Sequence, residues 1–286
     1  MPELPEVEIV KQSLNKIVKF KIIHNVLVNN RNLRFKVPEN FENYLKKKKI
    51  IKISRRSKYI IFELFFERYL LIHLGMSGTI HLSINNKKKN TNLSFYQKKD
   101  LPIKHNHISF FFNKFEIIYN DPRRFGFVKI FKTKVDILNY FSKLGPEPFY
   151  KSFNHVYLKK KFKDSIKNIK NFLLDQTLVS GIGNIYASEI LFMSRINPKK
   201  KVKDLTIGEI KKIVTKTRLI LKQAIKKGGS SIRDFKNIIG SKGNYQKEFK
   251  VYAREHYPCP TKGCKSKITK ININNRSTYY CKTCQK

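Results

Sequence analysis

The chain has 286 residues, with 61 lysines and arginines against 20 acidic residues, a formal net charge of +41 and a pI of about 10.1. This length allows a sizeable core and two domains, and the charge predicts an anionic partner such as nucleic acid. We expect a cytoplasmic protein with no membrane partner, because no signal peptide is recognisable and the most apolar run, residues 59–66, is short and holds Glu63.

Part of the lysine excess has a second explanation. Lysine, isoleucine and asparagine are over-used, with lysine runs at residues 46–49 and 87–89, which favours the hypothesis of drift in an AT-rich genome. We therefore assign these runs no contacts. The net charge of unrelated proteins from the same source would test the hypothesis, since neutral proteins would contradict genomic drift.

The first eight residues hold three carboxylates, Glu3, Glu6 and Glu8, in an otherwise basic chain. Removal of Met1 would leave Pro2 with a free secondary amine. An α-amino group has a reference pKa near 7.7–8.0, and a positive potential lowers the pKa further. Such an amine can attack a sugar or carbonyl carbon and form a Schiff base, with Glu3 handling the proton.

The same residues also form a good helix start. Pro5 suits the first turn, and acids complement the positive end of the helix dipole. An apolar face follows at helical spacing, formed by Val7, Val10, Leu14 and Ile17. On this segment alone, the structural interpretation is favoured over the chemical one.

The chain to about residue 130 is predicted to be β-rich. Short runs of β-branched and aromatic residues are broken by polar turns, at residues 50–53, 59–66, 69–74, 108–112 and 115–119. This spacing is typical of an antiparallel sandwich or barrel.

Residues 120–126 (NDPRRFG) form a predicted turn between two such runs. Two arginines and an aromatic at a hairpin tip suit insertion into nucleic acid, with Phe125 as a stacking wedge and Arg123 as a base-edge donor. A surface turn with Phe125 folded into the core is the other interpretation, and in isolation it is favoured.

Residues 144–148 (LGPEP) are a proline-rich break and mark a domain boundary. Helical spacing recurs over residues 157–227, and residues 228–231 (GGSS) are a flexible-loop signal. Within residues 178–187 the glycines permit close backbone approach, and Asn184 is a good cap for the following helix. A capped helix start after glycines is an anion site, although Gly-x-Gly alone is weakly specific.

The four cysteines lie in the last 28 residues as Cys259-x4-Cys264 and Cys281-x2-Cys284, with sixteen residues between the pairs. In a reducing compartment this spacing predicts one structural zinc ion held by four thiolates. The intervening hairpin is expected to turn at residues 274–275, which places Arg276 at its exposed tip. At that position the guanidinium of Arg276 is suited to bind phosphate. The other interpretation is an ordinary surface arginine.

Together these segments resemble a known family. Residues 2–8, 55–59, 73–78, 121–126, 181–189, 228–235 and the cysteine tail occur in the order seen in the bacterial formamidopyrimidine-DNA glycosylases, which excise 8-oxoguanine and act as AP lyases. The resemblance covers essentially the whole chain. The endonuclease VIII branch is similar at the start and in the zinc finger, but Leu4 and the 121–126 turn favour the formamidopyrimidine branch.

The resemblance implies a chemistry for four residues. Pro2 would attack the anomeric carbon of the damaged nucleotide, and Glu3 would act as general acid and base on the sugar. Lys58 matches a lysine that contacts phosphate and assists β-elimination. Arg276 matches a zinc-finger arginine that grips phosphate and assists δ-elimination, and residues 228–235 resemble a lid over the everted base.

It also implies DNA contacts, with damaged double-stranded DNA as the partner of a monomer. Met76, Arg123 and Phe125 match the trio that fills the gap left by the flipped nucleotide, with Arg123 reading the orphaned cytosine. Asn184 matches a phosphate-binding asparagine, and His105 matches a DNA-contacting histidine.

The implied fold class is α+β, in which an N-terminal β-sandwich carries a catalytic N-terminal helix. A helical helix–two-turn–helix domain and a C-terminal β-hairpin zinc finger follow it. We expect the catalytic domain at residues 1–132, a linker at 133–150, the helical domain at 151–240 and the finger at 245–286.

Three positions depart from the family pattern. The first cysteine pair is spaced x4 rather than x2, which stays within the zinc range but leaves the hairpin geometry open. Asp164 lies where relatives carry a basic, DNA-contacting run, and its negative charge argues against that contact. Asn106 stands where the family usually has aspartate.

Two other classes of protein remain as alternatives. A non-catalytic DNA-binding zinc protein would bind with strong salt dependence and cleave nothing, but Pro2, Glu3 and Lys58 all persist. An RNA-binding module is the weaker alternative, because the aromatic and glycine signatures of such folds are missing.

Overall fold

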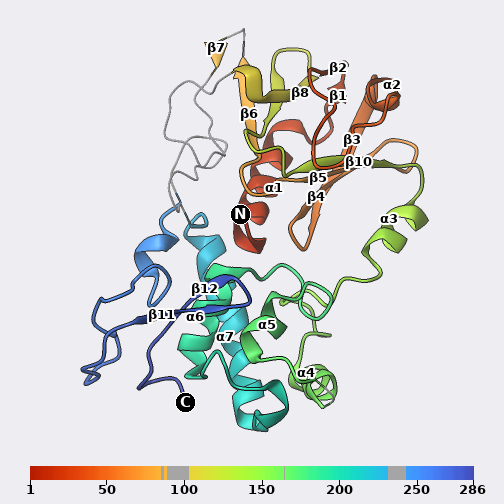
Figure 1. Ribbon diagram of the computed structural model, residues 1–286. Coiled ribbons are helices and arrows are strands. Elements are labelled where there is room, and N and C mark those ends of the chain that lie inside the picture. Colours follow the sequence, from red (N-terminus) through yellow and green to blue (C-terminus); the bar gives the residue numbers. More distant parts are fainter. Residues whose placement is uncertain (85–86, 89–102, 164, 231–242) are drawn as a thin grey trace. The chain divides into compact units, whose positions relative to one another are not determined.

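The computed structural model describes residues 1–84, 87–88, 103–163, 165–230 and 243–286 (Figure 1). The chain divides into two compact units. The first unit comprises residues 1–142 and 225–246, and the second comprises residues 143–224 and 247–286.

The first unit contains two five-stranded sheets in which every strand pairing is antiparallel. One sheet has the order β1 (Ile22–Ile23), β3 (Lys48–Arg56), β4 (Tyr59–Leu64), β5 (Arg68–His73) and β10 (Phe127–Phe131). The other has the order β2 (Asn25–Val28), β8 (Asn106–Phe111), β9 (Glu116–Asn120), β6 (Thr79–Ile84) and β7 (Lys87–Lys88).

Helix α1 (Leu4–Val18) and both sheets share one hydrophobic core. Leu14 of α1 is fully buried together with Ile50 and Ile72 of the first sheet and Ile80 and Tyr119 of the second. Pro5 lies in the first turn of α1, and the predicted apolar face at 3.6-residue spacing faces this core. The predicted helix start and antiparallel sandwich are therefore confirmed.

Two further helices belong to this unit, α2 (Phe41–Leu45) and α3 (Lys134–Phe141). Thr133 caps α3 by accepting a hydrogen bond from the Asp136 N–H at 3.1 Å. A short 3-10 helix, Ile103–His105, precedes β8.

The second unit contains α4 (His155–Phe162), α5 (Ile169–Leu174), α6 (Asn184–Ser194) and most of α7 (Ile207–Lys226). A short 3-10 helix lies at Val202–Asp204. Another, Tyr245–Glu248, begins with the last two residues of the first unit and ends in the second. Helix α6 is buried on almost all sides, which explains its lack of a polar face. Among the described helices, none is both long and apolar enough to cross a membrane.

A two-stranded hairpin of β11 (Thr269–Ile273) and β12 (Arg276–Tyr280) completes the second unit. Its turn lies at Asn274 and Asn275, as predicted, and both have positive φ, 46° and 57°. Two consecutive left-handed residues are the signature of a type I′ hairpin turn, which asparagine tolerates. Arg276 is consequently exposed beside the tip.

Candidate active site and DNA-binding surface

The start of the chain combines a helix start with buried acids. Glu3 immediately precedes α1 and is 3% exposed, and Glu6 in its first turn is 2% exposed. The Glu3 backbone N–H donates to Glu6 Oε2 at 2.9 Å, which satisfies a backbone donor that the helix itself leaves unpaired. The structural interpretation of this segment is thus correct, and it places the Glu3 carboxyl at a buried position next to the N-terminus.

Glu6 also connects distant parts of the chain. Its Oε1 accepts hydrogen bonds from both the N–H and the O–H of Ser230, each at 2.9 Å. Ser230 belongs to the segment of residues 228–235 that resembles a lid, of which residues 231–235 lie outside the described part of the chain. Sequence reasoning missed this role, because partners 224 residues apart leave no local signal.

A cavity of about 750 Å³ lies at the N-terminus in the first unit. It brings together the three predicted gap-filling residues, Met76, Arg123 and Phe125, which are all exposed. The Arg123 guanidinium lies 4.6 Å from the centre of the Phe125 ring, within cation–π range. The other residues that line the cavity are Met1, Asn32, Leu33, Arg34, His73, Gly75 and Arg124.

The terminal amine at this cavity is made less basic. Burial is the largest cause that lowers the pKa of the Met1 amine; the Glu3 and Glu6 carboxylates oppose this shift, and Lys58 and Arg123 support it. The prediction named positive potential alone, so desolvation is the cause that it missed. These four charged side chains all act on the amine, and removal of Met1 would give Pro2 the terminal amine among them.

Lys58 lies in the tight turn between β3 and β4 and is 6% exposed. The preceding Ser57 has a φ of 55°. Arg55 fixes this hairpin to α1, because its Nε donates to Glu8 Oε2 at 2.9 Å and its Nη1 donates to the Ser57 carbonyl at 2.9 Å. For the Glu8 carboxyl, burial raises the pKa, but the hydrogen bond from Lys11 and the charge of Arg55 outweigh it and lower the pKa.

Two residues of the cavity were missed by sequence reasoning, Arg34 and His73. Burial is the main cause that lowers the pKa of His73 to about 4, with further contributions from Lys58 and Arg34. The imidazole stacks on Phe127 at 5.1 Å between ring centres, and its Nδ1 accepts the Gly75 N–H at 3.1 Å. His73 opens the recognised 73–78 motif, so only its role escaped prediction.

His105 does not line this cavity. It ends the 3-10 helix, and its carbonyl accepts the Asp121 N–H at 3.0 Å, so it lies beside the turn that carries Arg123. Burial, Lys104 and His107 lower the pKa of His105. The neighbouring Asn106 accepts a hydrogen bond from Asn120 Nδ2 through its Oδ1 at 2.8 Å, a bond that the aspartate usual in the family could also accept.

In the second unit, Asn184 differs from its predicted capping role. Gly183 is the N-cap of α6 and Asn184 is the first helical residue. Its Nδ2 donates to the carbonyl of Ser277 at 2.9 Å, whereas its Oδ1 is buried without a hydrogen-bond partner in the described part of the chain. The side chain therefore binds the hairpin next to Arg276, and this unit brings Asn184 and Arg276 together.

The four cysteine sulfurs lie within 4.8 Å of one another. Cys259 Sγ is 3.8 Å from Cys284 Sγ, and Cys264 Sγ is 3.7 Å from Cys281 Sγ. Tetrahedral zinc–thiolate bonds of about 2.3 Å put the sulfurs about 3.8 Å apart, so the donor set fits one structural zinc ion. Gly263, with a φ of +78°, turns the four-residue loop back toward the site, and the x4 spacing is accommodated.

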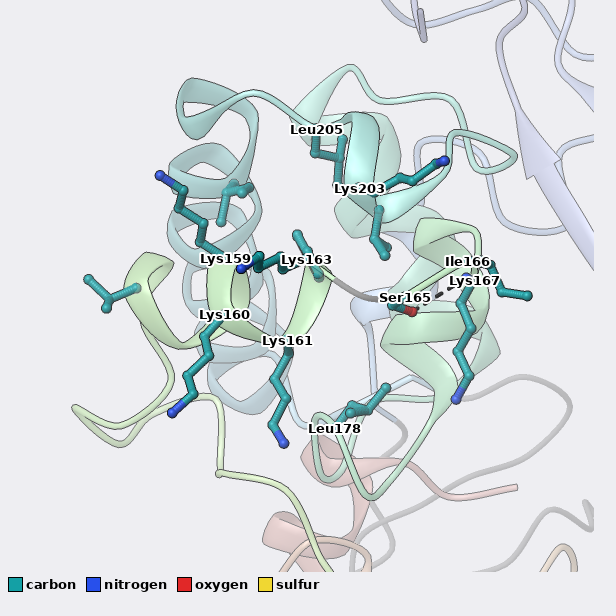
Figure 2. A pocket seen from close by; sticks show the side chains of 14 residues that line it. Lys159, Lys160, Lys161, Lys163, Ser165, Ile166, Lys167, Leu178, Lys203 and Leu205 are labelled. Carbon is teal, nitrogen blue, oxygen red and sulfur yellow. Dashed lines mark hydrogen bonds between the residues drawn. The ribbon is translucent and has the colours of Figure 1, made fainter.

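A second cavity, of about 1170 Å³, lies in the second unit around the end of α4 (Figure 2). Its apolar lining residues include Phe162, Leu178, Val202 and Leu205. Asp164 itself lies outside the described residues, but the segment on either side of it keeps a high density of positive charge. The lysines around the cavity are Lys159, Lys160, Lys161, Lys163, Lys167 and Lys203.

Comparisons with known proteins agree with this arrangement. Three family models match in order: the formamidopyrimidine-DNA glycosylase N-terminal domain at residues 1–128, its H2TH domain at 144–236, and the zinc finger found in FPG and IleRS at 258–286. The formamidopyrimidine-DNA glycosylases of Wolbachia sp. subsp. Brugia malayi (strain TRS) and Rickettsia bellii (strain OSU 85-389) are 42% and 39% identical to the chain, each covering 100% of both proteins.

Solved structures are similar over the same length. A Lactococcus lactis FPG mutant in complex with a Fapy-dG containing DNA superposes with a TM-score of 0.89 at 35% identity, covering 100% of both chains. The complex between Lactococcus lactis Fpg and an abasic site containing DNA gives a TM-score of 0.88 at 35% identity and 99% coverage.

A sandwich with the N-terminus in a basic cavity, followed by a helix–two-turn–helix domain and a zinc finger, defines a class of DNA glycosylases. Within that class, the chain belongs to the formamidopyrimidine-DNA glycosylase family.

Proposed function

We propose that this chain is a bifunctional DNA glycosylase and AP lyase that excises oxidised purines, such as 8-oxoguanine and formamidopyrimidines, from duplex DNA. The observation that carries the proposal is the start of the chain, which lies at a cavity where burial lowers the pKa of the Met1 amine and the charges of Glu3, Lys58 and Arg123 act on it. Removal of Met1 would place the amine of Pro2 beside the same groups. A nucleophilic amine must be unprotonated, so a lowered pKa increases its reactive fraction near neutral pH. Family membership and the Lactococcus lactis complexes with damaged DNA support the substrate class.

In the proposed mechanism the damaged nucleotide first leaves the helix, because its anomeric carbon is out of reach inside the stack. This eversion costs a few kcal/mol, and the cost is lowest for a damaged base. The amine of Pro2 then attacks that carbon, the base departs with its bonding electrons and a proton, and a Schiff base to the opened sugar remains. Glu3 transfers protons to and from the sugar, and its burial beside the amine supports that role.

Strand cleavage follows by β- and then δ-elimination of the two flanking phosphates. We assign Lys58 to assist the first elimination, supported by its electrostatic influence on the terminal amine. We assign Arg276 to grip phosphate and assist the second, supported by its exposure at the hairpin tip. The zinc site has four thiols and no open position, so zinc holds the finger and takes no part in the chemistry.

DNA recognition is assigned to the exposed residues. Met76 and Phe125 would fill the gap that the everted nucleotide leaves, and Arg123 would read the opposite cytosine. Asn184 would contact the phosphate backbone, and His105 would contact the DNA. We further propose that the protein acts as a cytoplasmic monomer with domains at residues 1–132, 151–240 and 245–286 and a linker at 133–150.

Borohydride trapping on a duplex with 8-oxoguanine opposite cytosine tests the proposal, with Pro2→Gly alongside. We expect a covalent adduct with the wild type, and its loss in the variant would fit the N-terminal nucleophile. Removal of Met1 and zinc content are checked first by mass spectrometry. A processed, zinc-loaded protein that forms no adduct would instead favour a non-catalytic DNA-binding protein.

A further inference from the structure

Two loops carry the gap-filling residues, and their backbones touch. Met76 lies in the loop of residues 74–78 between β5 and β6, and Arg123 and Phe125 lie in the loop of residues 121–126 between β9 and β10. A Cβ atom on Gly75 would lie 2.3 Å from the Gly126 nitrogen and 2.4 Å from the Phe125 carbonyl carbon. No side chain fits between the loops at this point, and the φ of +60° at Gly75 favours glycine as well.

A chain of hydrogen bonds joins the same two loops. The Arg123 backbone N–H donates to Ser77 Oγ at 3.2 Å, and the Ser77 hydroxyl donates to Asp121 Oδ1 at 2.5 Å. The other carboxylate oxygen of Asp121 accepts the Gly126 N–H at 2.8 Å. One hydroxyl and one carboxylate therefore connect the residue after Met76 to both ends of the loop that carries Arg123 and Phe125.

Both polar side chains are buried, with Ser77 at 3% exposure and Asp121 at 0%. A buried carboxylate is costly unless donors surround it, and Asp121 has a third donor in the Tyr119 hydroxyl at 3.3 Å. Burial, together with the Asp121 charge, raises the pKa of Tyr119 well above its ordinary value, so this hydroxyl stays a donor. The network is fully paired inside the protein while the three side chains that it supports stay exposed.

We propose that Ser77 and Asp121 are positioning residues that hold Met76, Arg123 and Phe125 as one rigid wedge. This inference rests on the proposed function, since it assigns the wedge to the DNA gap. A recognition group works only when neighbouring hydrogen bonds fix its position to a fraction of an ångström. If the two loops could move independently, Arg123 could not keep a fixed position relative to the opposite base while Met76 fills the gap.

The test compares Ser77→Ala with Ser83→Ala, a matched change at a buried serine of β6 (3% exposed) outside both loops. The first measurement is the ratio of kcat/KM for 8-oxoguanine opposite cytosine to that opposite adenine. The second is the fluorescence of 2-aminopurine placed beside a non-cleavable abasic analogue in duplex DNA, which reports insertion of the wedge.

We expect Ser77→Ala to lower the cytosine preference about three- to tenfold, the range expected for one or two lost buried hydrogen bonds, and to reduce the 2-aminopurine signal at saturating protein. Ser83→Ala should match the wild type, and Ser77→Thr, which keeps the hydroxyl, should recover both readouts. Should Ser77→Ala not fold, Asp121→Asn makes the same test with the shape of the side chain retained.

A folded Ser77→Ala protein with wild-type cytosine preference and wild-type 2-aminopurine signal would overturn the inference. The fluorescence measurement needs only binding, so it separates this inference from the proposed chemistry. A wild-type protein that inserts its wedge but traps no adduct would reject the proposed function and leave the positioning role standing.

Discussion

His73 is expected to make the stability of the first unit depend on pH. Its pKa is lowered from 6.5 to about 4, mainly by burial, so the unfolded chain binds a proton at pH 5 that the folded chain excludes. Stability therefore rises with pH across the window from about 4 to 6.5. The full pKa shift corresponds to about 3 kcal/mol of unfolding free energy, of which about 2 kcal/mol is lost when the pH falls from 7.5 to 5.

The structure also connects this titration to the wedge. Only the neutral imidazole can accept the Gly75 N–H at Nδ1, and Gly75 precedes Met76. Protonation would turn His73 Nδ1 into an N–H donor that faces the Gly75 N–H donor. We therefore expect the loop of residues 74–78 to open as His73 becomes protonated.

The assay measures the unfolding free energy of zinc-loaded wild type and His73→Gln at pH 7.5, 6.5 and 5, with hydrogen exchange in β5 as a local probe. The unfolding free energy of the wild type minus that of the variant should fall by about 2 kcal/mol between pH 7.5 and pH 5, because the variant has no imidazole to titrate. His24→Gln, at an exposed histidine, is the matched control. A difference that stays constant with pH would refute the argument.

Two further changes address the chemistry and the metal. Glu3→Gln should abolish base excision in single-turnover assays while fluorescence anisotropy shows DNA affinity largely retained, and a parallel loss of affinity would count against a chemical role. Cys264→Ser should lower the zinc content found by atomic absorption and weaken duplex binding at least tenfold, because three thiols remain around the ion; full zinc occupancy in this variant would contradict the four-thiolate site.

The sequence predicted elements whose own residues decide their structure. The helix α1 follows from Pro5 and a 3.6-residue apolar pattern, and the hairpin turn at Asn274 and Asn275 follows from residues that tolerate positive φ. Strands β1, β2, β6 and β7 were not among the predicted runs, and β10 was indicated only as the run that follows the turn at residues 120–126. β1 and β2 are two and four residues long, which is too short for a pattern to show. In β6 the polar Thr79, His81 and Ser83 do alternate with apolar residues, a two-residue period that the prediction overlooked.

The candidate site divides in the same way. The four cysteines were recognised from their spacing, because both pairs are local in sequence. The contacts of Glu6 with Ser230 and of Asn184 with Ser277 join residues 224 and 93 positions apart. No pattern within either segment indicates its partner, so a capping role was the reasonable prediction for Asn184 and the structure was needed to correct it.

The position of Arg276 depends on the helices as much as on zinc. An isolated two-stranded hairpin is marginally stable, and the thiols hold this one only at the end away from its turn. Near the turn, the buried Lys170 of α5 donates to the Ser277 carbonyl at 3.2 Å and to Thr278 Oγ1 at 2.8 Å.

Asn184 of α6 donates to the same Ser277 carbonyl, and Glu189 of α6 accepts three consecutive backbone N–H groups, those of residues 250–252, at 2.8 to 3.0 Å. Because these contacts come from side chains of α5 and α6, of which Lys170 and Glu189 are buried, the helical domain fixes the segment that leads into the finger and the strand that carries Arg276. Zinc closes the finger, and the helices determine where its arginine lies within the unit.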